Sequence, residues 1–195
     1  MFPLGSVLFP HMPMPLRVFE PRYLEMLRDI LQDEPSAFGV VLIERGPEVG
    51  GGDVRTTIGT IAHVSSLDTA GESVLMIAQG RHRIEVVEWL EDAPYPRAEV
   101  HELAEPDWSE ELRPLLEQAE ALVRRTIRIV EEAGGEQIWP ADVGLDDDPA
   151  AAAWQLAAIA PLGPLDQLDL LRSDTVERLL SRTVELVTDV EVLYQ

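Results

Sequence analysis

The sequence contains no lysine and no cysteine, and all 15 of its basic residues are arginine. A Walker-type phosphate loop needs a lysine that reaches the β- and γ-phosphates, so no such loop is present. A Ser–Lys peptidase dyad needs a lysine as its base, so that chemistry is excluded as well. Without cysteine there are neither disulfides nor thiolate zinc sites, which fits the reducing cytoplasm where we expect the protein to act.

The sequence also lacks an apolar run long enough to cross a bilayer. Its longest apolar stretch, 150–165, is shorter than a bilayer span and is interrupted by Pro161 and Gly163. The first residues have no basic segment of the signal-peptide kind, and prolines interrupt them. We therefore expect no membrane segment and no leader.

Acidic residues outnumber basic ones strongly, and the formal net charge is −21. Such a surface repels phosphate backbones, so we expect no nucleic-acid partner. A general acidic surface that carries no information about partners is the simpler interpretation, and a field that attracts cationic partners is the alternative. With 46% hydrophobic residues in 195, the chain has enough apolar material for a substantial core.

The stretch PLRVFEPRYLEML, residues 15–27, connects an extended segment to an amphipathic helix. Prolines keep the incoming chain extended and punctuate a turn, and a short apolar strand is expected before them at 4–9. Pro21 fits the first turn of the helix, with Glu20 at or near the N-cap. The helix has to end by Glu34, because a proline follows.

The rest of the first half is predicted to form short strands. We expect them at 37–44, 56–67, 73–79, from near 82 onward, and at 94–102. The segment 37–44 is almost continuously apolar, which predicts burial on both faces. Gly80 indicates a bend or bulge between two strands. The glycine-rich connection 46–53 is better explained as a hairpin tip than as a phosphate site. Together these strands and one early helix favour a closed or half-closed β structure.

The composition changes at 103–107, and beyond it the apolar spacing is helical. We expect helices at 113–134, 150–160 and 165–171, and from Asp174 to the end. Pro114 allows two starts for the first of these helices, one at Arg113 and the other at Ser109 with a kink at the proline. The sequence thus predicts an α+β chain, with a β-rich subdomain at 1–105 and a helical bundle at 106–195.

No recognisable pattern of catalytic or metal-binding residues is present. The histidines, none of them in a ligand spacing, are His11, His63, His82 and His101. The acidic run 146–148 is better explained as a helix N-cap cluster than as a metal site. Arg22, Arg81 and Arg83 are candidates for anion binding, although ion pairs with surrounding acids explain them better. We therefore assign no catalytic residue, no cofactor and no metal.

Binding through apolar surface is the interpretation that remains. Met12 and Met14 lie in a proline-rich segment whose side chains cannot all point inward, and methionine suits adaptable contacts, with core packing as the alternative. Trp89, Tyr95 and Trp139 lie at or near segment ends, where aromatic side chains often partly emerge, with packing between the subdomains as the alternative. These five residues are our candidates for peptide binding.

The run PLGSVLFPHMPMPLRVFEPRYLEMLRD, residues 3–29, resembles the opening signature of the Lon protease N-terminal domain, also called the Lon substrate-binding domain. Further matches are the strand at 38–43, IGTIA at 58–62 and GRHRI at 80–84. The resemblance covers essentially the whole chain and is strongest in its first half. It implies a PUA-like β-pseudobarrel with one early helix, followed by C-terminal helices. RNA binding, common among PUA relatives, is disfavoured here by the acidic balance.

The resemblance also implies a function in protein quality control, namely recognition of exposed apolar segments in misfolded or tagged polypeptides. Lon proteases resemble this domain followed by an ATPase and a Ser–Lys peptidase, so we expect a standalone member without those domains. We expect clients in a groove between the β-rich and helical parts, with a strand edge pairing the client backbone and an acidic rim favouring basic clients.

We therefore predict a non-enzymatic polypeptide-binding module. Its partners would be unfolded or apolar polypeptide segments, bound with low sequence specificity. One alternative is an adaptor or assembly protein that docks on a folded protease or associates weakly with itself. The other alternative, an enzyme of unrecognised type, lacks a supporting constellation of residues.

Overall fold

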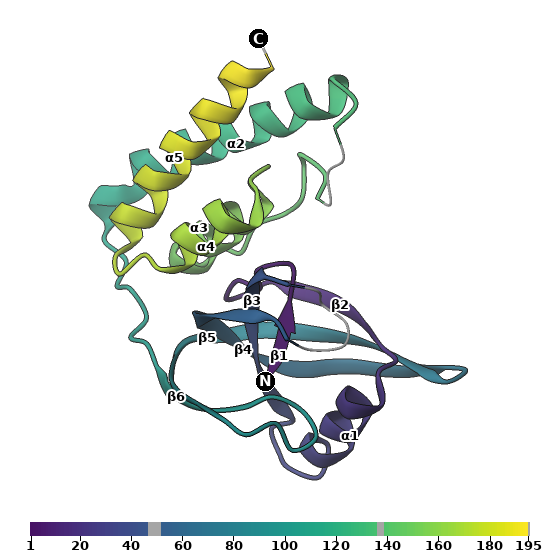
Figure 1. Ribbon diagram of the computed structural model, residues 1–195. Helices are drawn as coiled ribbons and strands as arrows, with labels where there is room; N and C mark the ends of the chain where they lie inside the picture. The colour runs from purple at the N-terminus through teal and green to yellow at the C-terminus, as the bar shows by residue number, and fades with distance from the viewer. Residues whose placement is uncertain (47–51, 136–138, 195) are drawn as a thin grey trace. The chain divides into compact units, whose positions relative to one another are not determined.

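The computed structural model describes residues 1–46, 52–135 and 139–194. The chain divides into two units, Met1–Leu103 and Ala104–Gln195 (Figure 1). In the described ranges, the first unit contains a six-stranded sheet and one α-helix, and the second contains four α-helices and a short 3-10 helix. None of the helices described combines the length and the hydrophobicity needed to span a bilayer.

The bounds of the elements are as follows. The first unit contains β1 (Phe2–Leu4), β2 (Pro13–Val18), α1 (Pro21–Ile30), β3 (Ala37–Arg45), β4 (Val54–Ala70), β5 (Ser73–Leu90) and β6 (Arg97–Glu102). The second unit contains η1 (Glu110–Leu112), α2 (Arg113–Glu132), α3 (Pro149–Ile159), α4 (Pro164–Leu171) and α5 (Val176–Leu193).

Strand β5 organises the sheet. It pairs with β4 along one side, and on the other side it pairs with β2 over its first half and with β6 over its second half. The order is β1-β3-β4-β5-β2, with β6 also on β5, and only the β1–β3 pairing is parallel among the strands described. We call β2, 64–70 of β4 and 73–79 of β5 the three-stranded arm. Figure 1 shows β4 and β5 running to their hairpin turn at one side of the unit.

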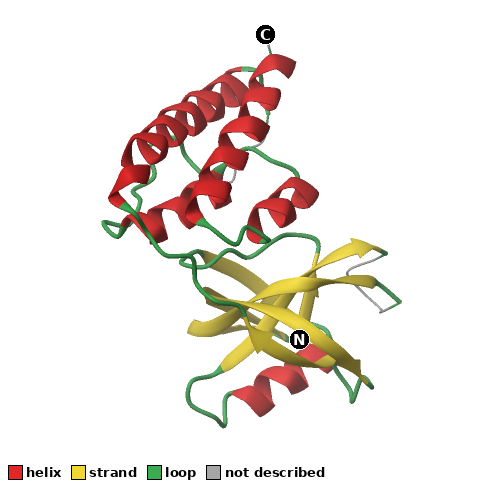
Figure 2. Ribbon diagram, turned by 90° about the vertical axis from the view of Figure 1, so that its left-hand side faces the viewer, coloured by secondary structure: helices red, strands yellow, loops and turns green. Residues whose placement is uncertain are grey.

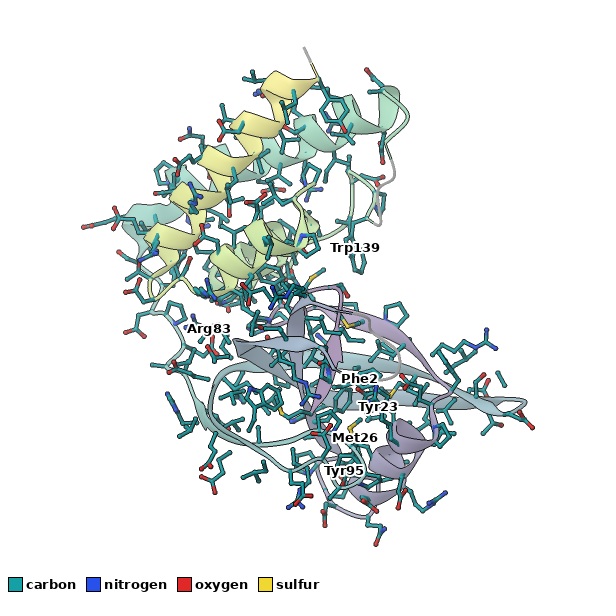
Figure 3. The ribbon with its side chains drawn as sticks, viewed as in Figure 1. Phe2, Tyr23, Met26, Arg83, Tyr95 and Trp139 are labelled. Carbon is teal, nitrogen blue, oxygen red and sulfur yellow. The ribbon has the colours of Figure 1, made fainter. Side chains whose placement is uncertain are left out.

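Helix α1 covers the lower end of the strands (Figure 2). It begins at Pro21 with an extended Glu20 as its N-cap, which confirms the prediction. The Tyr23 ring lies edge-on to the Phe2 ring of β1, with 4.3 Å between centroids, and Figure 3 shows both beside Met26. All three side chains are buried. Aromatic pairs of this geometry add about 0.5–1.5 kcal/mol to simple burial, so this cluster fixes the helix on the sheet.

Two predictions about the first strands are wrong. The first strand, β1, lies earlier than the strand expected at 4–9 and ends at Leu4. The residues after it leave the sheet, and the carbonyl of Leu8 accepts a hydrogen bond from the Thr60 hydroxyl at 2.6 Å. The proline-punctuated turn is instead strand β2, paired antiparallel with β5. The prolines tolerate this pairing because they alternate along the strand, so that their missing N–H groups fall on the side away from β5.

The two strands expected on either side of Gly80 are a single strand, β5, of 18 residues. The bulge predicted there is confirmed next to the glycine, because the register of β5 on β4 shifts between Gly80 and Arg83. The reason for glycine here is a crossing of the chain. A Cβ on Gly80 would lie 2.1 Å from the carbonyl oxygen of Phe9, and the Gly80 N–H donates to the Met12 carbonyl at 2.9 Å. Gly80 thus permits a close backbone approach and does not end a strand.

The prediction for β3 is confirmed, because its residues 38–42 are all buried. The glycine-rich connection predicted at 46–53 falls mostly on 47–51, which lie outside the described residues. Strand β6 begins at Arg97, later than the predicted start at 94, after the segment that contains both prolines.

The starts of the helices in the second unit follow from local capping. Helix α2 begins at Arg113, directly after a 3-10 turn that Ser109 caps, so both expected starts mark real features. The side chain of Asp148 caps α3 by accepting a backbone N–H at 3.1 Å, as predicted for the acidic run. The start expected at Asp174 for the last helix is wrong, because the Thr175 hydroxyl caps α5 by accepting the backbone N–H of Arg178, and the helix begins at Val176.

Helices α2, α3 and α5 share a core in which Trp154 is 1% exposed. A bidentate ion pair between Arg125 of α2 and Glu191 of α5, with N–O distances of 2.8 and 2.7 Å, joins two of these helices at their surface. Helix α3 is apolar on all sides, which agrees with its central position.

Candidate functional site

The three-stranded arm carries an apolar groove with a volume of about 440 Å³. Three consecutive residues from each of its strands line it: Pro15, Leu16, Arg17, Ser66, Leu67, Asp68, Leu75, Met76 and Ile77. Leu75 and Ile77 remain 44% and 42% exposed. Large aliphatic side chains with this exposure, gathered at a concave surface, are typical of a binding site.

The strand register arranges these residues in rows across the arm. Leu75 pairs with Arg17 on β2 and with Asp68 on β4. Ile77 likewise pairs with Pro15 on one side and Ser66 on the other. Because alternate residues of a strand lie on the same face, the rows of Leu75 and Ile77 lie on one face of the arm and form the walls of the groove, with the row of Met76 between them.

The segment 73–79 has the sequence SVLMIAQ, with apolar residues on both of its faces. Met76 and Ala78 point inward and are buried, whereas Leu75 and Ile77 point outward. An antiparallel strand with one solvated face normally alternates apolar and polar residues. The absence of this alternation in 73–79 is therefore a signal in the sequence that identifies Leu75 and Ile77 as candidate binding residues. Sequence reasoning did not use this signal.

Polar contacts hold the end of the groove near the hairpin turn. The Nε of Arg17 donates to the Ser73 hydroxyl at 3.2 Å, and that hydroxyl donates to the carbonyl of Ala70 at 2.9 Å. The Asp68 carboxylate accepts the backbone N–H of Thr69 at 2.8 Å. The row of Leu75 thus carries one cation and one anion at its two ends.

The outer edge of β2 is poor in hydrogen-bond donors. The Gly80 N–H donates to the Met12 carbonyl, so the residues of β2 bonded to β5 are those at even positions. The N–H positions of Pro13, Pro15 and Arg17 therefore face away from β5, and the two prolines have no N–H. A client strand would find few partners there, so side-chain contacts in the groove are better supported than the strand-edge pairing expected from the sequence.

None of the five residues predicted for peptide binding lines this groove. Met12 is 7% exposed, which agrees with the core-packing alternative, and Met14 is half-buried on β2 next to Pro15. Trp89 lies on the second half of β5, where the Arg55 guanidinium stacks over its ring at 4.8 Å.

The other two candidates, Tyr95 and Trp139, belong to segments outside the three strands of the arm. The Tyr95 hydroxyl donates to the Asp29 carboxylate of α1 at 2.8 Å, and Figure 3 labels this tyrosine below Met26. Burial, and then the hydrogen bond to Asp29, raise the pKa of Tyr95. Trp139 belongs to the second unit and is half-buried. Contact of these side chains with a client stays a prediction.

The three arginines considered for anion binding have different environments. Arg22 forms an ion pair with Glu20 at 3.1 Å, as the ion-pair interpretation expects. Arg83 is only 3% exposed, so a ligand in solution does not reach it. Arg81 is exposed, and no carboxylate of the described ranges pairs with it. Among the residues that the structure describes, no group of three or more histidine or acidic side chains is arranged to hold a metal ion.

Comparison with known proteins defines the family to which this chain belongs. A family model described as the ATP-dependent protease La (LON) substrate-binding domain matches residues 1–189. The chain belongs to this family, which confirms the resemblance seen in its opening run.

Sequence relatives are Lon proteases. Lon protease 2 of Myxococcus xanthus is 32% identical over 133 residues, which are 66% of this chain and 16% of that protein. Lon protease 2 of Herpetosiphon aurantiacus is 28% identical over 200 residues, which cover 97% of this chain and 23% of that protein. The chain therefore spans less than a quarter of the length of these curated relatives.

Solved structures agree with the family. The crystal structure of a Lon N-terminal domain protein from Xanthomonas campestris is similar with a TM-score of 0.67 and 25% identity, covering 94% of this chain and 95% of that one. The N-terminal domain of the Mycobacterium avium complex Lon protease gives a TM-score of 0.65 at 16% identity, covering 96% of this chain and 97% of that one, and shows the fold alone. The mixed α and β fold is thus that of Lon N-terminal domains.

Proposed function

We propose that this chain is a non-catalytic polypeptide-binding module that recognises exposed apolar segments of client proteins in the groove of the three-stranded arm. The observation that carries the proposal is the outward position of Leu75 and Ile77, two aliphatic side chains left about two-fifths exposed at a concave surface. The family to which the chain belongs is described as a substrate-binding domain, and the relatives are proteases, whose substrates are polypeptides.

The groove suits weak binding of many sequences. It has two rows of side chains as walls, and an apolar client side chain between them would displace water from both. Few fixed donors and acceptors line it, so client side chains are chosen by size and hydrophobicity more than by pattern. We expect dissociation constants in the micromolar range, which correspond to a binding free energy of about −8 kcal/mol.

The finer description of the fold belongs to the same proposal. A PUA-like pseudobarrel in the first unit is supported by the long strand β5, which pairs with other strands on both of its sides. A helical bundle in the second unit is supported by the core that α2, α3 and α5 share. The groove itself lies wholly within the β-rich unit, where all of its lining residues are found.

Hydrogen–deuterium exchange tests the location directly. The purified chain is measured with and without a saturating unfolded polypeptide, for example reduced and carboxymethylated α-lactalbumin. Protection of amides in 64–79 is the expected result, because the client covers the arm. The proposed function is refuted when neither unfolded protein nor apolar peptides bind at any salt concentration.

A further inference from the structure

The groove continues along β5 into basic side chains. The register of β5 on β4 shifts between Gly80 and Arg83, and the two residues at this irregularity, Arg81 and His82, are both exposed. His63 of β4 pairs with Gln79, in the row between Ile77 and Arg81. A surface that is apolar at the groove therefore becomes basic within a few residues of the same strand.

Three side chains make up this basic end: His63, Arg81 and His82. His63 lies opposite Gln79, two residues before Arg81. Burial, and after it the charges of Arg81 and His82, lower the pKa of His63. Arg81 and His82 are exposed. The basic end is thus available to a ligand that already contacts the arm.

Arg81 differs from some other arginines of the first unit in having no ion pair among the described residues. Arg22 and Arg55 of the same unit form ion pairs with carboxylates at 3.1 and 2.6 Å, whereas Arg81 has no carboxylate partner within 1–46, 52–135 and 139–194. Among the residues that line the groove, Asp68 alone is acidic, and its row is separated from the row of His63 by the row of Ile77. The strip is locally basic in a chain whose net charge is −21.

We propose that the groove and the basic end together recognise one continuous client segment, in which an acidic residue lies a few positions from an apolar one. The apolar side chain enters the groove between the rows of Leu75 and Ile77, and the carboxylate lies against Arg81 and His82. From the middle of the groove to Arg81 is roughly 16 Å of strand, which four or five extended client residues span. This inference rests on the proposed function of the groove.

The net charge of the chain predicts the opposite preference, namely basic clients. The two preferences arise from electrostatic interactions that act over different distances. Charges farther apart than the Debye length of about 8 Å at physiological salt are largely screened, whereas a carboxylate in contact with Arg81 is not. Local contact therefore decides the order of affinities, and the acidic remainder of the surface only weakens it.

Labelled peptides separate the two expectations. Each probe carries two leucines at alternate positions and a variable pair of residues, which is two aspartates, two serines or two arginines. In the first set of peptides the variable pair follows three residues after the leucines. In the second set it precedes the leucines by the same spacing. Binding is measured by fluorescence polarisation at 0.15 M and 1 M NaCl. In one of the sets, the aspartate peptide should bind about 3- to 10-fold more tightly than the serine peptide at the lower salt, and equally at the higher.

Variants assign the preference to the basic end. Arg81→Gln should reduce the aspartate preference, and Arg81→Glu should make the arginine peptide bind more tightly than the aspartate peptide. Arg97→Gln, an exposed arginine on β6, is the matched control and should leave the order unchanged. The serine peptide should bind all of these variants alike, because its contacts are apolar.

The outcomes distinguish the two proposals. If the arginine peptide binds most tightly in both sets, or if the aspartate preference survives Arg81→Glu and His82→Gln, recognition by the basic end is refuted while the apolar groove stands. If the serine peptide does not bind at all, the groove itself is refuted and this inference with it.

Discussion

Replacing Leu75 and Ile77 by threonine removes the apolar walls of the groove, and threonine is a β-branched residue that strands favour. Both side chains point outward, so the substitution leaves the buried face of β5 intact. We therefore expect the double variant Leu75→Thr, Ile77→Thr to fold normally and to bind apolar peptides weakly.

The size of the loss follows from the exposed fractions of 44% and 42%. Full burial of such a side chain is worth about 1.5–3 kcal/mol, so covering the exposed part of each contributes about 0.6–1.2 kcal/mol. Both together give about 1.2–2.4 kcal/mol, and threonine keeps one methyl group, so the dissociation constant should rise roughly 5- to 30-fold.

The assay is fluorescence polarisation with the serine peptide described above, at two salt concentrations. Val87→Thr is the matched control, because Val87 lies on the same strand, is 64% exposed and does not line the groove. Urea denaturation of each variant checks the fold. An unchanged affinity in a folded double variant, or an equal loss in the Val87 variant, would refute the reasoning.

Three further predictions concern the stability of the first unit. Gly80→Ala should destabilise by about 3 kcal/mol or more, since its Cβ would meet a carbonyl oxygen at 2.1 Å, whereas Gly144→Ala, with open space around it, should change the urea midpoint little. Thr60→Val should lower the free energy of unfolding by about 1–3 kcal/mol, because it leaves the buried carbonyl of Leu8 without its donor. Thr57→Val, at an exposed position of the same strand, is the control and should change the free energy of unfolding little. Equal losses in the two variants would contradict this reasoning. The pKa of His63 is lowered in the folded state, so its contribution to stability is present above its ordinary pKa and is lost as the pH falls through the lowered value. His63→Gln should therefore flatten the fall in the urea midpoint on acidification, and an identical pH dependence in both proteins would speak against it.

Local patterns in the sequence were sufficient for several elements of this fold. Pro21 and Glu20 define the start of α1, and Asp148 caps α3, because capping depends only on neighbouring backbone groups. The apolar run of β3 predicted its burial on both faces. The family, too, was recognisable from the opening run at 3–29, since that stretch combines several local constraints.

Long-range pairing was not visible in this way. The local pattern of the proline-rich segment predicts a turn. The segment forms strand β2 because it pairs in one register with β5, which lies far later in the sequence. The role of Gly80 depends equally on a distant chain segment, since the close approach of Phe9 is not encoded near the glycine. Prediction from local pattern fails at such positions because the competing interaction is tertiary.

The sequence by itself thus determined the family, the starts of α1 and α3, and the exclusion of lysine chemistry in these residues, because these depend on residue types and their spacing. Only the tertiary structure decided which apolar side chains face outward. The register of β2 and β4 on β5 places Leu75 between Arg17 and Asp68, and Ile77 between Pro15 and Ser66. A shift of one residue would turn each of these side chains to the other face, so the groove exists through pairing and not through composition.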